Sequence, residues 1–301
     1  MPNNPIAAAV RQPLRAVLAF SLAINISILA PSIFMLQVFD RVLTTRSVET
    51  LLLMAAIASA TLLLMGWLEY LRARSLAAIG VLVEQEQGEP LLRRLLGGPA
   101  GGAAPEALRD LSVVRAFLGG PGVLALCDAP WTAVYLALIF LFHPAMGWLA
   151  TGCTLALLAL ALVNERMTRQ RVVDLGDALR QTGRVADVAL RQAEVVTALG
   201  MRPALARRWS ARSAMAHRLQ LGLAQKSALF SAATRLARQF VQVLMLGYGA
   251  YLVIQEHATP GIMLAATIIL ARALAPIEQL MGGWKQLVEA RAARSEEHTS
   301  E

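Results

Sequence analysis

Two charged residues interrupt the last long apolar segment of the chain, and they are its first candidates for a binding site. Arg272 and Glu278 lie in the otherwise uncharged run 258–278. Within a membrane, a guanidinium costs at least ~2.5–3.5 kcal/mol on insertion scales, so Arg272 should face water, a ligand or a carboxylate such as Glu278. The alternatives are a purely structural ion pair, or a side chain that reaches toward the membrane surface.

A third polar residue, Asn25, lies in the uncharged run 16–39, which also contains Pro31. A proline within a helix removes a backbone hydrogen bond and bends the helix, so a bend is expected there. We group Asn25 with Arg272 and Glu278 as candidate residues of a cavity inside a helical bundle.

No pattern of catalytic or metal-binding residues accompanies this group. The sequence contains no GxSxG, no HExxH and no GxxxxGK[ST] phosphate-binding loop. Cys127 and Cys153 lack metal-ligand spacing and fit small buried side chains better than a zinc site or a disulfide. We therefore expect no catalytic residue, no metal site and no cofactor site within this chain, which leaves open whether the whole protein is an enzyme.

The elements that carry these residues are long apolar runs. Hydrophobic residues make up 56% of the chain and charged residues 16%, where soluble domains carry roughly 25%. Since about 20 apolar residues cross a bilayer, the runs predict an all-α membrane protein. Six spans are expected, at 16–39, 50–69, 123–142, 145–164, 239–255 and 258–278. Four spans and a re-entrant pair remain an alternative.

The basic residues predict how the spans are oriented. The connections 70–122 and 165–238 are rich in arginine, whereas the connections at 143–144 and 256–259 contain none. Positive residues near span ends favour the cytoplasmic side. We expect a cytoplasmic N-terminal tail, 1–15, and two cytoplasmic long connections in a plasma membrane. The net charge of +8 is explained by this topology, so no binding of nucleic acid is expected.

The longer connection should form a helical hairpin. Apolar residues recur at helical spacing on both sides of a break at Leu199–Pro203, from Val172 to Leu190 and from Leu205 to Leu223. Two helices of about 30 residues would project roughly 45 Å from the membrane. The alternative is an amphipathic pair that lies on the membrane surface.

Several sequence stretches together resemble the transmembrane domain of ABC exporters, over about residues 12–293. The stretch Leu29–Leu43 (LAPSIFMLQVFDRVL) is similar to the first span and outer turn of type I secretion permease/ATPases, the subfamily that exports proteases and lipases. Further similar stretches follow in the same order: Leu108–Leu111, Gly120–Gly122, Asp128–Trp131, Phe142–Pro144, Arg191–Met201 and Arg272–Glu278.

The resemblance implies a transmembrane domain at 16–293 with six helices, long cytoplasmic helical extensions and a homodimeric assembly in a bacterial inner membrane. It implies that unfolded polypeptide crosses the membrane by alternating access, past Arg272, Glu278 and Asn25. It also implies a periplasmic adaptor, an outer-membrane channel and secreted polypeptide cargo as partners, with ATP and Mg bound by a nucleotide-binding domain.

In such exporters the tips of the inner helices dock onto the ATPase domains. By position, one tip of this chain is around Leu108–Val114 and the other is Glu194–Met201. A tip needs a short helix with an apolar contact and a few charges. The coupling residues expected on this basis are Arg109, Asp110, Glu194, Leu199, Gly200 and Met201.

Three features depart from the family pattern. The first inner connection is dense in glycine and proline, including Gly88 and Pro90, so the path of the first arm is open. No nucleotide-binding domain is present in the chain. Residues 294–301 resemble a translated sequencing adapter, so we expect the genuine part of this sequence to end near Ala293, where the gene fragment was truncated.

Two other function classes remain as alternatives. One is an ABC exporter of peptides or lipids. The other is a non-enzymatic membrane scaffold or sensor whose long inner helices bind partners.

Overall fold

The computed structural model describes residues 5–97, 112, 115–116 and 119–299, and in this part of the chain the secondary structure is helical. Six helical stretches are long and apolar enough to cross a membrane, as the apolar runs predict: Pro13–Thr45, Val48–Pro90, Gly122–Phe142, Pro144–Arg191, Arg202–Ile254 and Pro260–Gln279. The all-α membrane fold with six spans is therefore confirmed.

The first span is interrupted where Pro31 predicts a bend. Two residues separate helix α1 (Pro5–Ser27) from α2 (Ala30–Gln37), and Pro31 lies in the first turn of α2. A π-helical turn, η1 (Val38–Val42), and the short α3 (Leu43–Thr45) then lead into α4 (Val48–Gly97). Helix α4 continues through Gly88 and Pro90 to Gly97, so these residues do not break the first arm.

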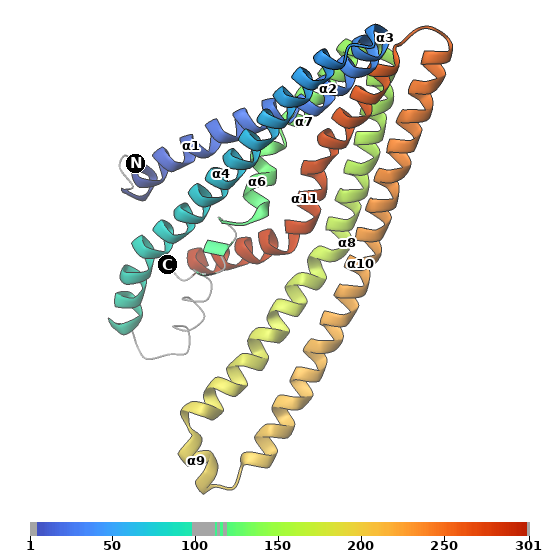
Figure 1. Ribbon diagram of the computed structural model, residues 1–301. Helices are drawn as coiled ribbons and strands as arrows, with labels where there is room; N and C mark the ends of the chain where they lie inside the picture. Colours follow the sequence, from blue (N-terminus) through green and yellow to red (C-terminus); the bar gives the residue numbers. More distant parts are fainter. Residues whose placement is uncertain (1–4, 98–111, 113–114, 117–118, 300–301) are drawn as a thin grey trace.

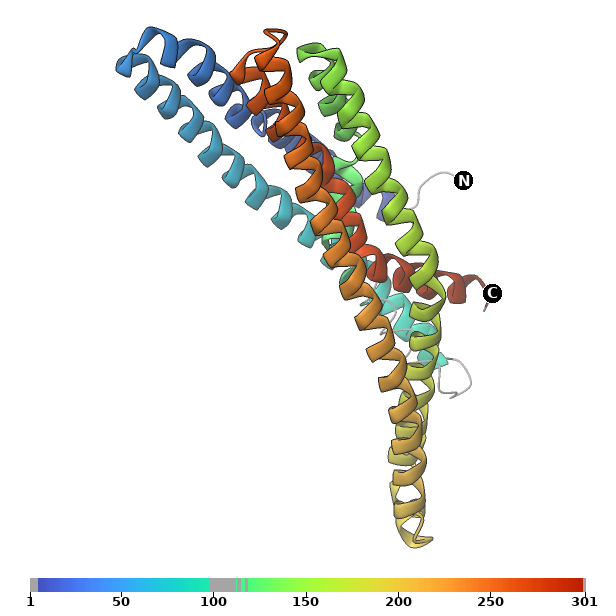
Figure 2. The same cartoon turned by 90° about the vertical axis from the view of Figure 1, so that its right-hand side faces the viewer.

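The remaining helices form a second group, and the last helix of the chain is at its centre. They are α6 (Pro121–Asp128), α7 (Trp131–Phe142), α8 (Pro144–Arg191), α9 (Ala193–Ala198), α10 (Arg202–Ile254) and α11 (Pro260–Thr299). Helix α11 contacts α2, α6, α7, α8 and α10, whereas α4 packs chiefly on α1. Figure 1 shows α1 and α4 diverging from α8 and α10 toward the end of the bundle where α9 lies, and Figure 2 shows the hairpin of α8 and α10 extending well beyond the other helices.

The main apolar core lies between α7, α8, α10 and α11. Its fully buried side chains include Ile139, Met146, Met245, Ile269 and Leu270. Helix α10 approaches α11 closely at Gly249, where an added Cβ would lie 2.6 Å from the Cγ of Met263. This packing holds α10 and α11 side by side and so positions the polar residues of both helices.

Helices α8 and α10 project as an antiparallel hairpin with α9 at its tip (Figure 1), as the periodicity predicts. Val172, Leu175 and Leu223 form a small buried core within the hairpin, and Leu219 packs against it. Nearer the tip, Leu179, Leu190 and Trp209 are exposed, because only one helix is available to cover each of them. The projecting hairpin is confirmed, with an apolar core in only part of its length.

Candidate functional site: a polar cluster, a groove and two helix ends

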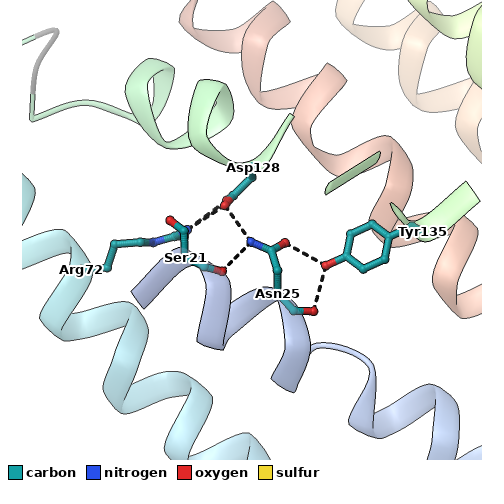
Figure 3. Close-up of polar contacts among 5 residues, drawn as sticks. All are labelled: Ser21, Asn25, Arg72, Asp128 and Tyr135. Carbon is teal, nitrogen blue, oxygen red and sulfur yellow. Dashed lines mark hydrogen bonds and ion pairs between the residues drawn. The ribbon is translucent and has the colours of Figure 1, made fainter. Parts of the chain in front are cut away.

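Five polar side chains meet among α1, α4, α6 and α7 (Figure 3). The carboxylate of Asp128 accepts hydrogen bonds from Arg72 Nη1 at 2.9 and 3.1 Å and from Asn25 Nδ2 at 3.0 Å. Arg72 Nη1 also donates to Ser21 Oγ at 3.1 Å, and Tyr135 OH donates to Asn25 Oδ1 at 2.8 Å. We call Ser21, Asn25, Arg72, Asp128 and Tyr135 the polar cluster.

Local structure explains why these residues meet. Ser21 and Asn25 are one helical turn apart and share a face of α1. Asp128 is the last residue of α6, and Tyr135 lies on α7 just beyond the break at Ala129–Pro130. Asn25 is 3% exposed, Arg72 8% and Tyr135 2%. A charged pair with this little access to water needs hydrogen-bond partners, and the cluster supplies several of them.

A groove between α10 and α11, with a volume of about 660 Å³, lies next to this cluster. Its polar lining consists of Arg238, Gln239, Gln242, Thr267 and Arg272. Arg272 also lines a smaller pocket of about 90 Å³, together with Asn25, Glu69, Arg72, Asp128 and Tyr135. Arg272 therefore stands between the open groove and the polar cluster.

Of the contacts considered for Arg272, the ion pair with Glu278 is not formed. Glu278 Oε2 instead accepts a hydrogen bond from Arg238 Nη1 of α10 at 3.1 Å. Residues six positions apart point about 120° away from each other on an α-helix, so Arg272 and Glu278 do not share a face of α11. Among the residues that the structure describes, Arg272 has no hydrogen-bond or ion-pair partner.

The tip of the hairpin is a short helix closed by a glycine. Gly200 has a φ of 67°, in the left-handed region that favours glycine. Its N–H donates to Thr197 O at 3.1 Å, and the N–H of Met201 donates to Val196 O at 2.9 Å. These two bonds form a Schellman motif that ends α9. Leu199, in the last position before Gly200, is 66% exposed and points an apolar side chain away from the hairpin core.

At the opposite end of the bundle, the Asp40 carboxylate binds the start of α11. Its Oδ2 accepts a hydrogen bond from Thr259 Oγ1 at 2.7 Å, and its Oδ1 accepts one from the N–H of Gly261 at 2.9 Å. Asp40 belongs to η1, so this contact ties the first span to the last one. We call these three residues the Asp40 clasp.

The comparisons with known proteins agree with this architecture. The family model for the ABC transporter transmembrane region matches residues 14–275, which is most of the chain. The chain belongs to this family. Its six spans and projecting hairpin are thus those of an ABC transporter membrane domain.

Proteins of type I secretion systems are among the relatives of this membrane domain. It is 34% identical over 296 residues to the type I secretion system ATP-binding protein PrsD of Rhizobium meliloti, covering 96% of this chain and 51% of PrsD. It is 24% identical over 275 residues to the cyclolysin secretion/processing ATP-binding protein CyaB of Bordetella pertussis, covering 89% of this chain and 39% of CyaB. The chain spans about half the length, or less, of these curated relatives.

A leukotoxin translocation ATP-binding protein, LktB of Mannheimia haemolytica, is also similar, at 23% identity over 285 residues that cover 89% of this chain and 39% of LktB. The resemblance to type I secretion proteins that the sequence stretches indicate is thereby confirmed at the level of the family.

The predicted site residues of this ABC membrane domain fall into separate places. Glu194, Leu199, Gly200 and Met201 come together at the hairpin tip. Arg109 and Asp110 lie outside the described residues. Asn25 lines the small pocket, with its amide engaged by Asp128, Ser21 and Tyr135.

Sequence reasoning did not single out Arg72 as a site residue. It stands just after the second apolar run, where a basic residue is expected for topology alone. Asn25 and Asp128 could have indicated the role of Arg72, because both are lone polar residues in or beside apolar runs. Each of them required a partner from another helix.

Proposed function

We propose that this chain is the membrane-spanning part of an ATP-driven type I secretion exporter that moves unfolded polypeptide across the inner membrane by alternating access. The observation that carries the proposal is the 34% identity to PrsD over 96% of this chain, within the ABC transporter membrane family. An ATP-binding domain, with ATP and Mg, would supply the energy. The domain would belong to the same gene or to a separate chain.

The arrangement of the helices supports transport better than a scaffold role. Arg272 and the polar lining of the groove belong to helices that would cross the membrane, beside spans that diverge toward the hairpin end (Figure 1). A side chain with a full charge at that depth favours a water-filled path over contact with lipid. In the exporter we propose, Arg272 and the groove border the path of the cargo, while Asn25 and Glu278 hold the helices that form it.

The partners follow from the type I assignment. The exporter would be a homodimer that works with a periplasmic adaptor and an outer-membrane channel to release its secreted cargo. The most apolar part of α4 is not buried within the chain, which leaves this surface available to lipid or to a second subunit. The N-terminus and the hairpin tip would lie in the cytoplasm.

The first test is to sequence the intact gene through and beyond codon 293. We expect the reading frame to continue into a phosphate-binding loop of the GxxxxGK[ST] type and then into an ABC signature motif. A genuine stop codon after Glu301, with no gene for an ATP-binding partner in the same genome, would contradict the proposal and favour a scaffold.

The hairpin tip supplies a second test, made in the complete transporter. Leu199→Asp should reduce secretion about tenfold or more while ATP hydrolysis continues, because the loss of one docking contact uncouples the two activities. The matched control is Leu221→Asp, an equally exposed leucine on α10 away from the tip, which should secrete normally. Normal secretion by the Leu199 variant would contradict the role of the tip.

A further inference from the structure

Arg272 lines the groove between α10 and α11 and forms no ion pair with any residue that the structure describes. Two nearby pairs of charged groups are already engaged: Arg238 holds Glu278 at 3.1 Å, and Arg72 holds Asp128 at 2.9 Å. Glu69 lines the small pocket with Arg272 but is not within ion-pair distance of it. Arg272 is thus a groove cation that no carboxylate of the described residues contacts in an ion pair.

Two neighbours of Arg272 in the groove, Gln239 and Gln242, have unused hydrogen-bonding groups, whereas Thr267 does not. Thr267 donates its hydroxyl to Met263 O at 2.8 Å within its own helix, so it is satisfied. Gln239 and Gln242 make no hydrogen bond within the described residues, although both line the groove. They are three positions apart on α10 and share a face. A glutamine amide both donates and accepts, which matches the peptide groups of an extended chain.

From these observations we propose that the groove is a carboxylate-recognition site for the cargo. Arg272 binds the aspartate or glutamate side chains of an extended polypeptide, and Gln239 and Gln242 pair with its peptide groups. The inference rests on the proposed export of unfolded polypeptide and adds a chemical preference for acidic segments. A planar guanidinium favours this role because it can bind both oxygens of a carboxylate at once.

The depth of Arg272 argues for a cargo carboxylate over a lipid phosphate. Arg272 lies twelve residues after Pro260, where α11 begins, which places it about 18 Å along the helix. The hydrocarbon core is about 30 Å thick, so this position is well inside it and away from either layer of headgroups. A polypeptide that crosses the membrane passes this depth, whereas lipid phosphates remain at the surfaces.

The test measures peptide binding to the purified chain in nanodiscs of phosphatidylcholine. Two fluorescent peptides are compared, a flexible Gly/Ser chain that carries aspartates and the same chain with asparagines in their place. The wild-type protein should bind the aspartate peptide about tenfold more tightly, as expected for one charge-assisted contact, and salt should weaken this preference.

Three variants assign the preference to Arg272. Arg272→Gln should bind both peptides as weakly as the wild type binds the asparagine peptide. Arg272→Lys should retain part of the preference and so controls for misfolding. Arg235→Gln removes an exposed arginine of α10 that does not line the groove, and it should behave as the wild type does.

Each adverse result has a distinct meaning. Equal binding of both peptides by the wild type, or a preference that survives in Arg272→Gln, overturns the carboxylate site but leaves polypeptide export standing. Binding of neither peptide overturns both proposals. A preference that disappears when phosphatidylglycerol is added to the nanodisc assigns Arg272 to a lipid phosphate and overturns the site for cargo.

Discussion

Asp128 and Asp40 each join helices that are far apart in the sequence, but their carboxylates accept hydrogen bonds from different kinds of donor group. Asp128 accepts hydrogen bonds from a guanidinium and an amide in a site where its side chain is 15% exposed and that of Arg72 is 10% exposed. Asp40 is half-buried near the end of the bundle, and it accepts hydrogen bonds from a hydroxyl and a backbone N–H at the start of α11.

The difference reflects how much water each carboxylate can reach. A buried carboxylate requires a full opposite charge, because little solvent is present to stabilise it. Near the surface, the free N–H groups and the positive end of a helix dipole are sufficient partners. The polar cluster should therefore contribute more to stability than the Asp40 clasp, and the two can be compared by substitution.

The largest effect is expected from Asp128→Ala. This change leaves the guanidinium of Arg72 buried without its counter-ion, which typically costs about 3–5 kcal/mol. The free energy of unfolding, measured by titration with denaturing detergent, should fall by that amount. An unchanged value would show that the cluster is solvated in the membrane-bound protein.

A double variant distinguishes two effects of Asp128→Ala: the loss of the ion pair, and the burial of the Arg72 charge without a partner. Replacing both partners by apolar residues, Asp128→Leu with Arg72→Met, should recover most of the lost stability because no charge then remains buried. If the double variant is less stable than Asp128→Ala, the attraction between the two charges outweighs the cost of burying them.

A smaller effect is expected from Asn25→Ala. Its amide bridges Asp128 and Tyr135, so its removal leaves both with one fewer hydrogen bond in a buried site. The expected cost is about 1–3 kcal/mol in the same detergent titration. Ser27→Ala, two residues further along α1, is the matched control and should be neutral. Equal stability of the two variants would mean that water replaces the amide.

The elements of this fold were predictable because their signals are local. Apolar runs of sufficient length predict the six spans, and the break at Leu199–Pro203 predicts the tip because Gly200 and Pro203 act on the backbone beside them. The bend before Pro31 was predictable for the same reason.

The pairing of charges was not predictable in this way. Arg72 meets Asp128 across 56 positions, and Arg238 meets Glu278 across 40. Such pairs depend on which helices pack together and at what rotation, and helical periodicity alone does not specify either. Arg272 and Glu278 are close in sequence, and proximity suggested a pair that the 100° step of the helix prevents.

The smallest effect is expected at the clasp. Asp40→Ala removes the acceptor for Gly261 N–H and Thr259 Oγ1, so it should cost about 1 kcal/mol, the usual value of a helix N-terminal cap. Asp40→Asn retains an acceptor oxygen and should lose less. Because the clasp acts at the first turn of α11, hydrogen exchange should rise at the amides of Gly261 and Ile262 and stay unchanged at the hairpin tip. A loss of stability as large as that of Asp128→Ala would instead show that the clasp, and not the buried cluster, is the main link between the first span and the rest of the bundle.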